Sequence, residues 1–326
     1  MAMAYSGMDV LCAGSRYLKN DTVLVMEKTL VDLGAYVRHA RETLGYEKVV
    51  LVGWSGGGSL ALTYQWQALA PSITRTAAGD PLDIRAADLQ PADGIVFVAA
   101  HANRARILSE WLDPSVRDEA HPERRERELD LYDPSNPNHA PFDPGYVAHF
   151  REAQRARTAR ITAWVRERLE TLCRRGGAEQ EHPFVVHRTL ADPRFLDVTL
   201  EPNGRRANWC FLGPPEVVNV APNGLARYSS LRSWLSQWSL EDSVADGARA
   251  ASRIDTALLV IENDADDAVP PSHPRSVYEA AASTDKERVV IPDATHFYLN
   301  QPAALNEALS VIQKWGEARG FGGRLG

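Results

Sequence analysis

A serine enclosed by glycines directly follows an apolar run and offers the first chemistry in this sequence. Residues 48–52 read KVVLV, and the chain continues with Gly53, Trp54, Ser55, Gly56 and Gly57. A serine hydroxyl becomes a good nucleophile when a neighbouring base takes its proton. A sharp strand-to-helix turn exposes such a serine and crowds the residues two before and two after it, which favours glycine at 53 and 57. We interpret Ser55 as a nucleophile; the alternatives are glycines that only allow close packing, or a phosphate loop, whose Gly-Lys-Ser/Thr ending is missing.

The base for Ser55 is expected to be a histidine late in the chain, with an acid between them. Among nine histidines, His296 comes just after the last apolar run and can reach the same sheet edge as Ser55. His101, which follows another apolar run, is the main rival and a candidate for lining a pocket. His39 lies in a predicted helix and is expected on the surface or in packing, and His273 is placed to cap a helix. We therefore assign the base to His296.

The acid must orient the imidazole and stabilise its charged form. Asp264, Asp266 and Asp267 all lie in the segment after residues 257–261 (ALLVI). Capping a helix is the structural alternative for each of them. Asp293 is a weaker candidate because it precedes His296 closely within one turn. The residues alone leave the choice among the three aspartates open.

The elements that would position these residues follow the pattern of a parallel sheet. Apolar, β-branched runs bounded by turn residues predict buried strands at 9–13, 48–52, 94–100, 257–261 and 288–291. Helical spacing predicts helices at 23–44, 59–69, 276–282 and 303–315. Strands alternating with helices indicate an α/β fold with helices on both faces of a mostly parallel sheet.

The segment 101–250 differs from the rest of the chain, because it lacks strong parallel-strand runs. A long amphipathic helix is predicted at 146–172, with Phe150, Ile161, Trp164, Val165 and Leu169 facing inward and arginines facing solvent. Asn203-Gly204 predicts a β-hairpin turn within 195–211. The tryptophans Trp209, Trp234 and Trp238 make the segment aromatic-rich and are candidate pocket residues together with His101.

Composition excludes several classes of protein. The chain has 326 residues, 44% of them hydrophobic, and a formal net charge of −7, which is globular composition without the basic face of nucleic-acid binders. Cys12, Cys173 and Cys210 lie far apart without metal-ligand spacing, so we expect a reducing compartment, no disulfide framework and buried, unreactive thiols. We expect no metal and no cofactor. Neither a signal peptide nor a membrane span is evident, which makes a cytoplasmic location the default expectation. The oligomeric state is not predicted.

Three segments resemble the α/β-hydrolase superfamily, in the family's order of serine, acid and histidine. They are residues 52–59 (VGWSGGGS), 258–270 (LLVIENDADDAVP) and 293–299 (DATHFYL). The family's acid loop reads Gly-x-x-Asp-x-x-Val-Pro, and with Asn263 in place of the glycine it aligns on Asp266. The resemblance covers 1–100 and 251–326, which would form the core. It implies that 101–250 is a large, mainly helical cap inserted after the family's sixth strand.

One departure from the family concerns the oxyanion hole, the set of N–H groups that stabilises the negatively charged intermediate. In the family, a loop after the third strand supplies the second donor. Only 54 residues precede Ser55, so residues 9–13 align with the fourth strand and the first three strands are unaccounted for. Either the sequence begins downstream of the natural start or the fold is rearranged. We expect 9–13 to be a parallel strand with no third strand beside it, and only the Gly56 N–H as a backbone oxyanion donor.

The resemblance implies a serine hydrolase that cleaves carboxylic esters through an acyl-enzyme formed on Ser55. Amidases, peptidases, thioesterases and carbon–carbon hydrolases use the same three residues, and motifs do not separate them. A serine rather than an aspartate at the turn argues against epoxide hydrolases and dehalogenases. The tryptophans of the cap hint at an apolar or aromatic small-molecule substrate. The competing hypothesis is a catalytically impaired or truncated hydrolase-like protein that binds a ligand.

Overall fold

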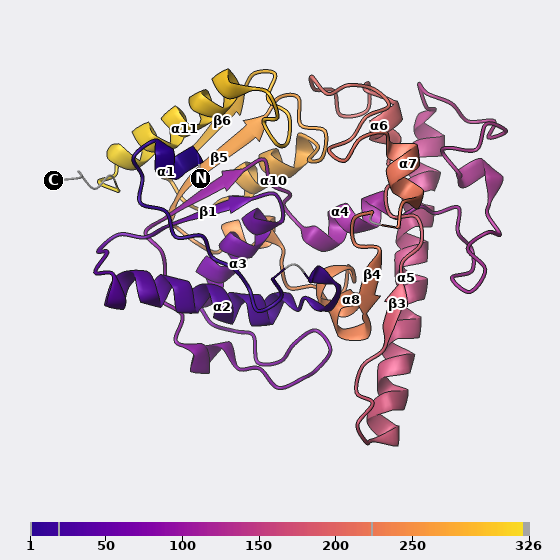
Figure 1. Ribbon diagram of the computed structural model, residues 1–326, viewed down its shortest axis with the longest axis horizontal. Coiled ribbons are helices and arrows are strands. Elements are labelled where there is room, and N and C mark those ends of the chain that lie inside the picture. The colour runs from indigo at the N-terminus through magenta and orange to yellow at the C-terminus, as the bar shows by residue number, and fades with distance from the viewer. Residues whose placement is uncertain (1, 19, 223, 322–326) are drawn as a thin grey trace.

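A parallel sheet of four strands forms the centre of the molecule in the computed structural model, which describes residues 2–18, 20–222 and 224–321 (Figure 1). The strands are adjacent in the order β1 (Val50–Trp54), β2 (Gly94–Val98), β5 (Ala257–Asn263) and β6 (Lys286–Ile291). All three pairings are parallel. The strand predictions in these four regions are confirmed to within two residues at either end.

Helices cover both faces of the sheet. One face packs against α2 (Met26–Arg38), α3 (Gly56–Leu69), α9 (Gly247–Ala251) and α10 (Ser272–Ala280), and the other against α11 (Pro302–Glu317). Successive strand residues point to opposite faces. In β2, Ile95 and Phe97 therefore join the core under α3, whereas Val96 and Val98 join the core under α11. The predicted α/β fold with helices on both faces is confirmed.

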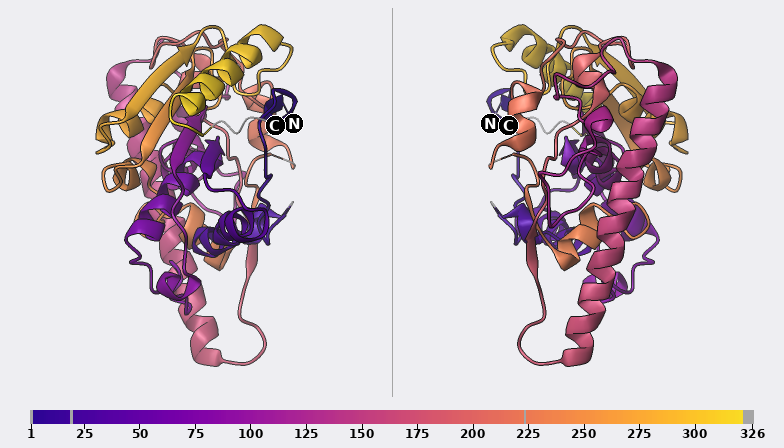
Figure 2. Two further views of the ribbon diagram at one scale, coloured as in Figure 1. Left: turned by 90° about the vertical axis from the view of Figure 1, so that its left-hand side faces the viewer. Right: turned by 90° about the vertical axis from the view of Figure 1, so that its right-hand side faces the viewer.

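The segment between β2 and α9 forms a second, mainly helical body with its own apolar core, to which Leu112, Ile161 and Trp234 belong. Its helices are α4 (Arg104–Trp111), α5 (Pro144–Arg175), α6 (Pro193–Leu196), α7 (Pro215–Val220) and α8 (Leu231–Gln237). A small antiparallel sheet pairs β3 (Pro183–Val185) with β4 (Tyr228–Ser230). Figure 2 shows α5 running along one side of the molecule.

The remaining short elements lie outside the central sheet. They are α1 (Ala2–Tyr5), the 3₁₀ helices η1 (Asp21–Val23), η3 (Ile84–Ala87) and η4 (Arg127–Leu129), and the π-helical turn η2 (His39–Thr43). The turn η2 continues α2, so the helix predicted at 23–44 is present from Met26 to Thr43, with a change of winding at His39. Its predicted start is three residues too early, because Leu24 and Val25 are extended. Within the described residues, no helix is both long enough and apolar enough to cross a membrane.

Two predicted strand regions are wrong. Residues 9–13 are exposed and irregular, and no strand of the described chain lies outside β1 to provide a pairing partner for them. The hairpin predicted within 195–211 is absent as well. That loop wraps around the buried Arg205, whose guanidinium donates hydrogen bonds to the carbonyls of Arg194, Asp197, Leu200 and Glu201. Carbonyls held in this way are not available to pair two strands.

The predictions for two other kinds of side chain need partial correction. On α5, Phe150, Ile161, Val165 and Leu169 are buried as predicted, but Trp164 is 41% exposed and contacts Phe184 at the helix surface. Of the three cysteines, only Cys210 is buried, and burial raises the pKa of its thiol to about 11. Cys12 and Cys173 are exposed, so a packing role does not hold for them.

Candidate active site

Ser55 lies in a strained turn between β1 and α3. Its backbone has φ 53° and ψ −119°, in a region that a residue with a Cβ rarely adopts. A Cβ built on Gly53 would lie 2.5 Å from the Gly57 carbonyl oxygen and 2.6 Å from the Gly58 Cα. Both obstacles are backbone atoms, so glycine is required at 53 for the chain to pass from strand to helix this closely. The turn lifts the Ser55 side chain to the end of the sheet.

The expectation that Gly57 is equally crowded is wrong. A Cβ on Gly57 would have no heavy-atom neighbour within 4 Å. The crowded position is Gly58, where a Cβ would lie 2.5 Å from the Ala100 Cβ and 2.6 Å from the Phe97 ring. Gly58 therefore lets α3 pack closely against the end of β2, a role that the sequence pattern did not separate from that of Gly57.

His296 faces Ser55 from the loop after β6. Its Nε2 lies 3.1 Å from the Ser55 Oγ, which is hydrogen-bonding distance. The histidine is 1% exposed. Trp54, the residue before Ser55, stacks obliquely on the imidazole with 4.8 Å between ring centroids, and its indole N–H donates to the His296 carbonyl at 3.3 Å. The histidine is thus held by the same turn that carries the serine.

Asp266 is the aspartate that contacts the imidazole. Its carboxylate oxygens lie 3.1 and 3.2 Å from the His296 Nδ1, and its Oδ1 also accepts hydrogen bonds from the backbone N–H groups of Ala268 and Val269, both at 2.8 Å. These two N–H groups fix the position of the carboxylate beside the imidazole. The site therefore has the hydrogen-bonding order Asp266, His296, Ser55.

The other acidic candidates have different contacts. Asp267 accepts the backbone N–H of His296 at 3.4 Å, and burial together with the charge of Asp266 raises the pKa of its carboxyl. Asp264 is joined to the segment 101–250 by its carbonyl, which accepts the Gly204 N–H at 2.8 Å. Asp293 lies in the turn after β6 with a positive φ of 55°. None of these three has a side-chain hydrogen bond to the His296 ring among the described residues.

Asn263 joins the loop of the acid to the loop of the histidine, a role that the sequence did not reveal. Its Nδ2 donates to the Thr295 carbonyl at 2.9 Å, and its Oδ1 accepts from the Tyr298 hydroxyl at 2.6 Å. Burial raises the pKa of Tyr298 to about 12, so the phenol stays protonated as the donor. This asparagine stands where the resembling family has glycine, and its side chain fixes the distance between the two loops.

The parallel sheet explains why residues so distant in sequence meet. Ser55 follows β1, Asp266 follows β5 and His296 follows β6. In a parallel sheet all carboxyl ends lie at one edge, which is where α/β proteins place their sites. His101 follows β2 and reaches the same edge. A Cβ on Gly56 would lie 3.6 Å from the His101 ring, so this predicted pocket residue does lie beside the nucleophile turn.

The predicted tryptophans do not line this site. Trp234 and Trp238 stack on each other, with ring centroids 4.9 Å apart, and both are buried inside the segment 101–250. Trp209 packs beneath the Arg206 guanidinium at 4.8 Å. The rings around His296 come instead from Trp54, Phe211 and Phe297, and Phe211 in turn contacts Trp111. Nothing in the local sequence distinguishes Phe211 or Trp111 from core residues.

The rival histidines are occupied or neutral. His273 is buried and its Nδ1 accepts the Ala102 N–H at 3.1 Å. Burial lowers the pKa of His101 well below its ordinary value, and the nearby charges of Arg104, His273 and His296 lower it further. His39 belongs to the turn η2, which continues α2 and precedes β1 in the chain. Neither His101 nor His273 has a side-chain hydrogen bond to Ser55 among the described residues.

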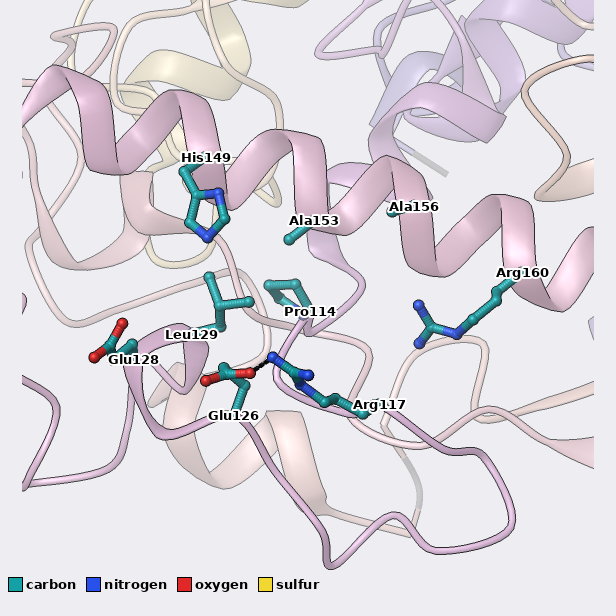
Figure 3. A pocket seen from close by; sticks show the side chains of 9 residues that line it. All are labelled: Pro114, Arg117, Glu126, Glu128, Leu129, His149, Ala153, Ala156 and Arg160. Carbon is teal, nitrogen blue, oxygen red and sulfur yellow. Dashed lines mark ion pairs between the residues drawn. The ribbon is translucent and has the colours of Figure 1, made fainter.

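A separate cavity of about 440 Å³ lies on the segment 101–250 (Figure 3). It is bounded on one side by α5, with His149 and Arg160, and on the other by the segment that carries Arg117, Glu126 and Leu129. Arg117 and Glu126 form an ion pair on that second side. None of its lining residues belongs to the group around Ser55. Within the described ranges, no cluster of three or more histidine, cysteine or acidic side chains is arranged to hold a metal ion.

No protein-family model and no curated protein matches this sequence. Solved structures with a similar arrangement include a monoacylglycerol lipase from Paleococcus ferrophilus (15% identity, TM-score 0.41, 90% of this chain and 75% of that one). A thermophilic esterase from Thermogutta terrifontis shares 17% identity, with a TM-score of 0.38 over 91% of this chain and 73% of that one. The hypothetical protein PA2218 from Pseudomonas aeruginosa shares 13%, with a TM-score of 0.45 over 93% and 71%.

Similarity at this level carries no information on substrate, and the class follows from the chain's own geometry. A parallel sheet carries a serine in a strained strand-to-helix turn, and an acid and a histidine follow later strands in that order. These features define the α/β-hydrolase fold. The resemblance indicated by the sequence is confirmed at the level of fold.

Proposed function

We propose that this protein is a serine hydrolase that cleaves carboxylic esters through an acyl-enzyme intermediate. The observation that carries the proposal is the continuous hydrogen-bonded series from Asp266 through His296 to Ser55, with heavy-atom distances of 3.1 Å at both junctions. The buried carboxylate holds the proton of the imidazole on Nδ1 and leaves Nε2 free to accept the serine proton. Backbone strain at Ser55 keeps its hydroxyl at that position.

In the proposed reaction, the Ser55 Oγ attacks the ester carbonyl carbon while the His296 Nε2 takes the hydroxyl proton. The tetrahedral intermediate collapses, the bond to the alcohol oxygen breaks, and the alcohol leaves with that proton. Water then attacks the acyl-enzyme, with Nε2 again accepting a proton, and the acid is released as Ser55 is restored. The backbone N–H of Gly56, next to the nucleophile, is the proposed donor to the oxyanion.

We further propose that residues 101–250 act as a cap over a core formed by 1–100 and 251–326. Two contacts between these parts support the assignment. Asn203 donates from its side chain to the Asp266 carbonyl at 3.1 Å, and Phe211 donates its N–H to the Asp267 carbonyl at 3.2 Å. The Phe211 ring also lies 5.7 Å from the imidazole of His296. A cap that contacts the acid loop can shape the substrate site without supplying a reacting group.

The test is covalent labelling with a fluorophosphonate, which reacts with activated serines. We expect labelling of the wild-type protein and its loss in Ser55→Ala, together with loss of hydrolysis of short p-nitrophenyl esters by several orders of magnitude. Ser59→Ala is the matched control, because Ser59 lies one turn along α3, is buried, and its hydroxyl has no partner among the described residues. Labelling that survives in Ser55→Ala would assign the nucleophile elsewhere. An unlabelled wild-type protein would favour a ligand-binding role.

A further inference from the structure

Two nitrogen-bearing side chains converge on Gly56, the residue after the proposed nucleophile. A Cβ built on Gly56 would lie 2.7 Å from the Arg104 Nη1 and 3.6 Å from the His101 Cε1. Both residues come from the stretch that follows β2, and Arg104 begins α4. The absence of a side chain at Gly56 thus leaves space that a guanidinium occupies directly beside the N–H proposed to bind the oxyanion.

Arg104 is held in place from one side only. Its Nε donates to the Gln237 Oε1 at 2.7 Å. The Gln237 amide is itself fixed, because its Nε2 donates to the carbonyls of Asp21 and Leu24 at 3.1 and 3.2 Å. Neither Nη1 nor Nη2 of Arg104 has a hydrogen-bond acceptor within the described part of the chain. The guanidinium is therefore oriented by Gln237 while its outer nitrogens stay available.

Other buried arginines of this protein are compensated. Arg157, Arg188 and Arg194 each pair with at least one carboxylate at 2.6 Å or less. Arg227 lacks a carboxylate but donates to several backbone carbonyls. Arg104 is partly buried, and burial lowers the pKa of its guanidinium, yet an arginine remains cationic at neutral pH. The charge of Asp21 acts on Arg104 from a distance, but no carboxylate of the described residues lies within 4.0 Å of the guanidinium to form an ion pair. A cation left beside a reactive turn in this way favours an anion from a ligand.

His101 adds a second unsatisfied group. The residue is 5% exposed, and its Nδ1 has no hydrogen-bond partner among the described residues. A buried nitrogen left without a hydrogen-bond partner is destabilising. A neutral imidazole donates one hydrogen bond and brings no competing charge. A ligand with several acceptor oxygens would satisfy both His101 and Arg104.

The geometry points to a carboxylate-binding subsite formed by Arg104 and His101, so that the esters cleaved at Ser55 carry a negative charge close to the scissile carbonyl. The planar fork of a guanidinium matches the two oxygens of a carboxylate, and a charge-assisted bond of this kind is about twice as strong as a neutral one. Gln237 would orient the fork, and Gly56 would keep the subsite within reach of the reacting carbon. This inference rests on the proposed ester hydrolysis for its substrate class.

The first test compares the hydrolysis of monomethyl succinate and methyl butyrate. The two esters differ in that methyl butyrate has a methyl group in place of the free carboxylate. NMR follows the release of methanol from each. We expect the wild type to prefer the anionic ester. Arg104→Met should lower kcat/KM for monomethyl succinate by about 10- to 100-fold, the value of one hydrogen bond to a charged group, and leave methyl butyrate within about threefold. Arg104→Lys should recover part of the loss. Arg106→Met is the matched control, since Arg106 is exposed on the same helix.

Equal losses for both esters in Arg104→Met would overturn the subsite, because a group that acts on the oxyanion or on folding affects every ester. A wild type with no preference for the anionic ester would overturn it as well.

The second test separates this proposal from the ester hydrolysis itself. Saturation-transfer NMR measures succinate against succinamide on Ser55→Ala, which needs no turnover.

We expect succinate to bind Ser55→Ala more tightly than succinamide, and that preference to disappear when Arg104→Met is added. Succinate that binds no better than succinamide, or equally well without Arg104, refutes the subsite even if fluorophosphonate labels Ser55. Succinate binding that depends on Arg104, in a protein whose Ser55 is not labelled, supports the subsite and refutes the hydrolase. The two failures are thus distinguishable.

Discussion

At the scale of single residues, the main feature of the site is that the groups proposed to react are either strained or buried: the backbone of Ser55 is strained, and the side chains of Asp266 and His296 are buried. Ser55 keeps a positive φ of 53°, a conformation that costs a residue with a side chain of the order of 1–3 kcal/mol. Asp266 and His296 are both nearly inaccessible to solvent. The surrounding packing and the backbone N–H groups of Ala268 and Val269 hold these groups together. The fold therefore fixes the site before any substrate arrives.

Asp266→Asn is expected to reduce turnover of short p-nitrophenyl esters by about 10⁴-fold, because an amide stabilises the wrong imidazole tautomer. Asp264→Asn is the matched control. That residue lies two positions earlier, and its carbonyl, which the substitution keeps, accepts the Gly204 N–H. It should retain activity within a few-fold. Steady-state kinetics of the two variants decide the point, and a larger loss in Asp264→Asn would show that the acid had been misassigned.

The buried histidines predict that stability falls in mild acid. The pKa of His101 lies well below its ordinary value of 6.5, and burial lowers that of His273 too. Below about pH 6.5 the unfolded chain binds protons that the folded chain does not, so the free energy of unfolding decreases as pH falls. Each such group contributes up to about 1.4 kcal/mol per pH unit.

Urea unfolding at pH 7.5, 6.5 and 5.5 measures this dependence. We expect His101→Asn to have a shallower slope of unfolding free energy against pH than the wild type, whatever its stability at pH 7.5. His149→Asn is the control, because His149 is exposed on α5 and should leave the slope unchanged. A slope in His101→Asn as steep as in the wild type would mean that His101 is already protonated in the folded state near neutrality.

At the scale of elements, the strand-to-helix turn makes opposite predictions for two glycines four residues apart. Gly53→Ala places a methyl group 2.5 Å from a backbone carbonyl oxygen that cannot move without distorting the turn. We expect a loss of about 1–3 kcal/mol or more in unfolding free energy, and loss of Ser55 labelling. Gly57→Ala meets open space within α3, so it should be neutral or stabilising by up to about 1 kcal/mol. Thermal unfolding and fluorophosphonate labelling report both effects.

The sequence predicts the elements that hold the site better than the segments between them. The central strands β2 and β5 are nearly continuous apolar runs because both their faces are covered, and this pattern is readable without a structure. The edge strands β1 and β6 are partly exposed but carry shorter apolar runs that are also readable. The shared carboxyl edge of the four strands then brings Ser55, Asp266 and His296 together. Residues 9–13 have a similar apolar pattern but no neighbouring strand among the described residues, and the loop around Arg205 follows the hydrogen bonds of one guanidinium. Local patterns do not encode such tertiary partners.

The pocket residues show the same limit. Trp234 and Trp238 stand out by type, yet they are core residues of the segment 101–250. Arg104 and Phe211 are ordinary in the sequence and become notable only through their contacts with Gly56 and His296. His101 could be predicted because it directly follows a strand, so the topology places it at the same edge as Ser55. Position relative to a strand end was therefore more informative here than residue type.

At the scale of the whole molecule, a network of ion pairs within the segment 101–250 also contacts α10, which packs on the central sheet. Arg194 is 7% exposed at its side chain and pairs with Glu110, Asp192 and Glu201, which lie on or near α4 and α6. Glu201 also accepts the N–H of Ser272 at the start of α10, and Glu110 lies 3.8 Å from the ring of His273. This network links the proposed cap to a helix of the core.

Arg194→Met should therefore destabilise the protein by about 3–5 kcal/mol, because it leaves buried carboxylates without their cation. Arg166→Met is the matched control: Arg166 also pairs with two carboxylates, but its side chain is 45% exposed, and its loss should cost about 1 kcal/mol or less. Urea unfolding measures the two costs. Hydrogen exchange should show faster exchange in α4, α6 and the start of α10 for Arg194→Met only. Comparable costs for both variants, or faster exchange confined to α6, would show that the network does not hold the two parts together.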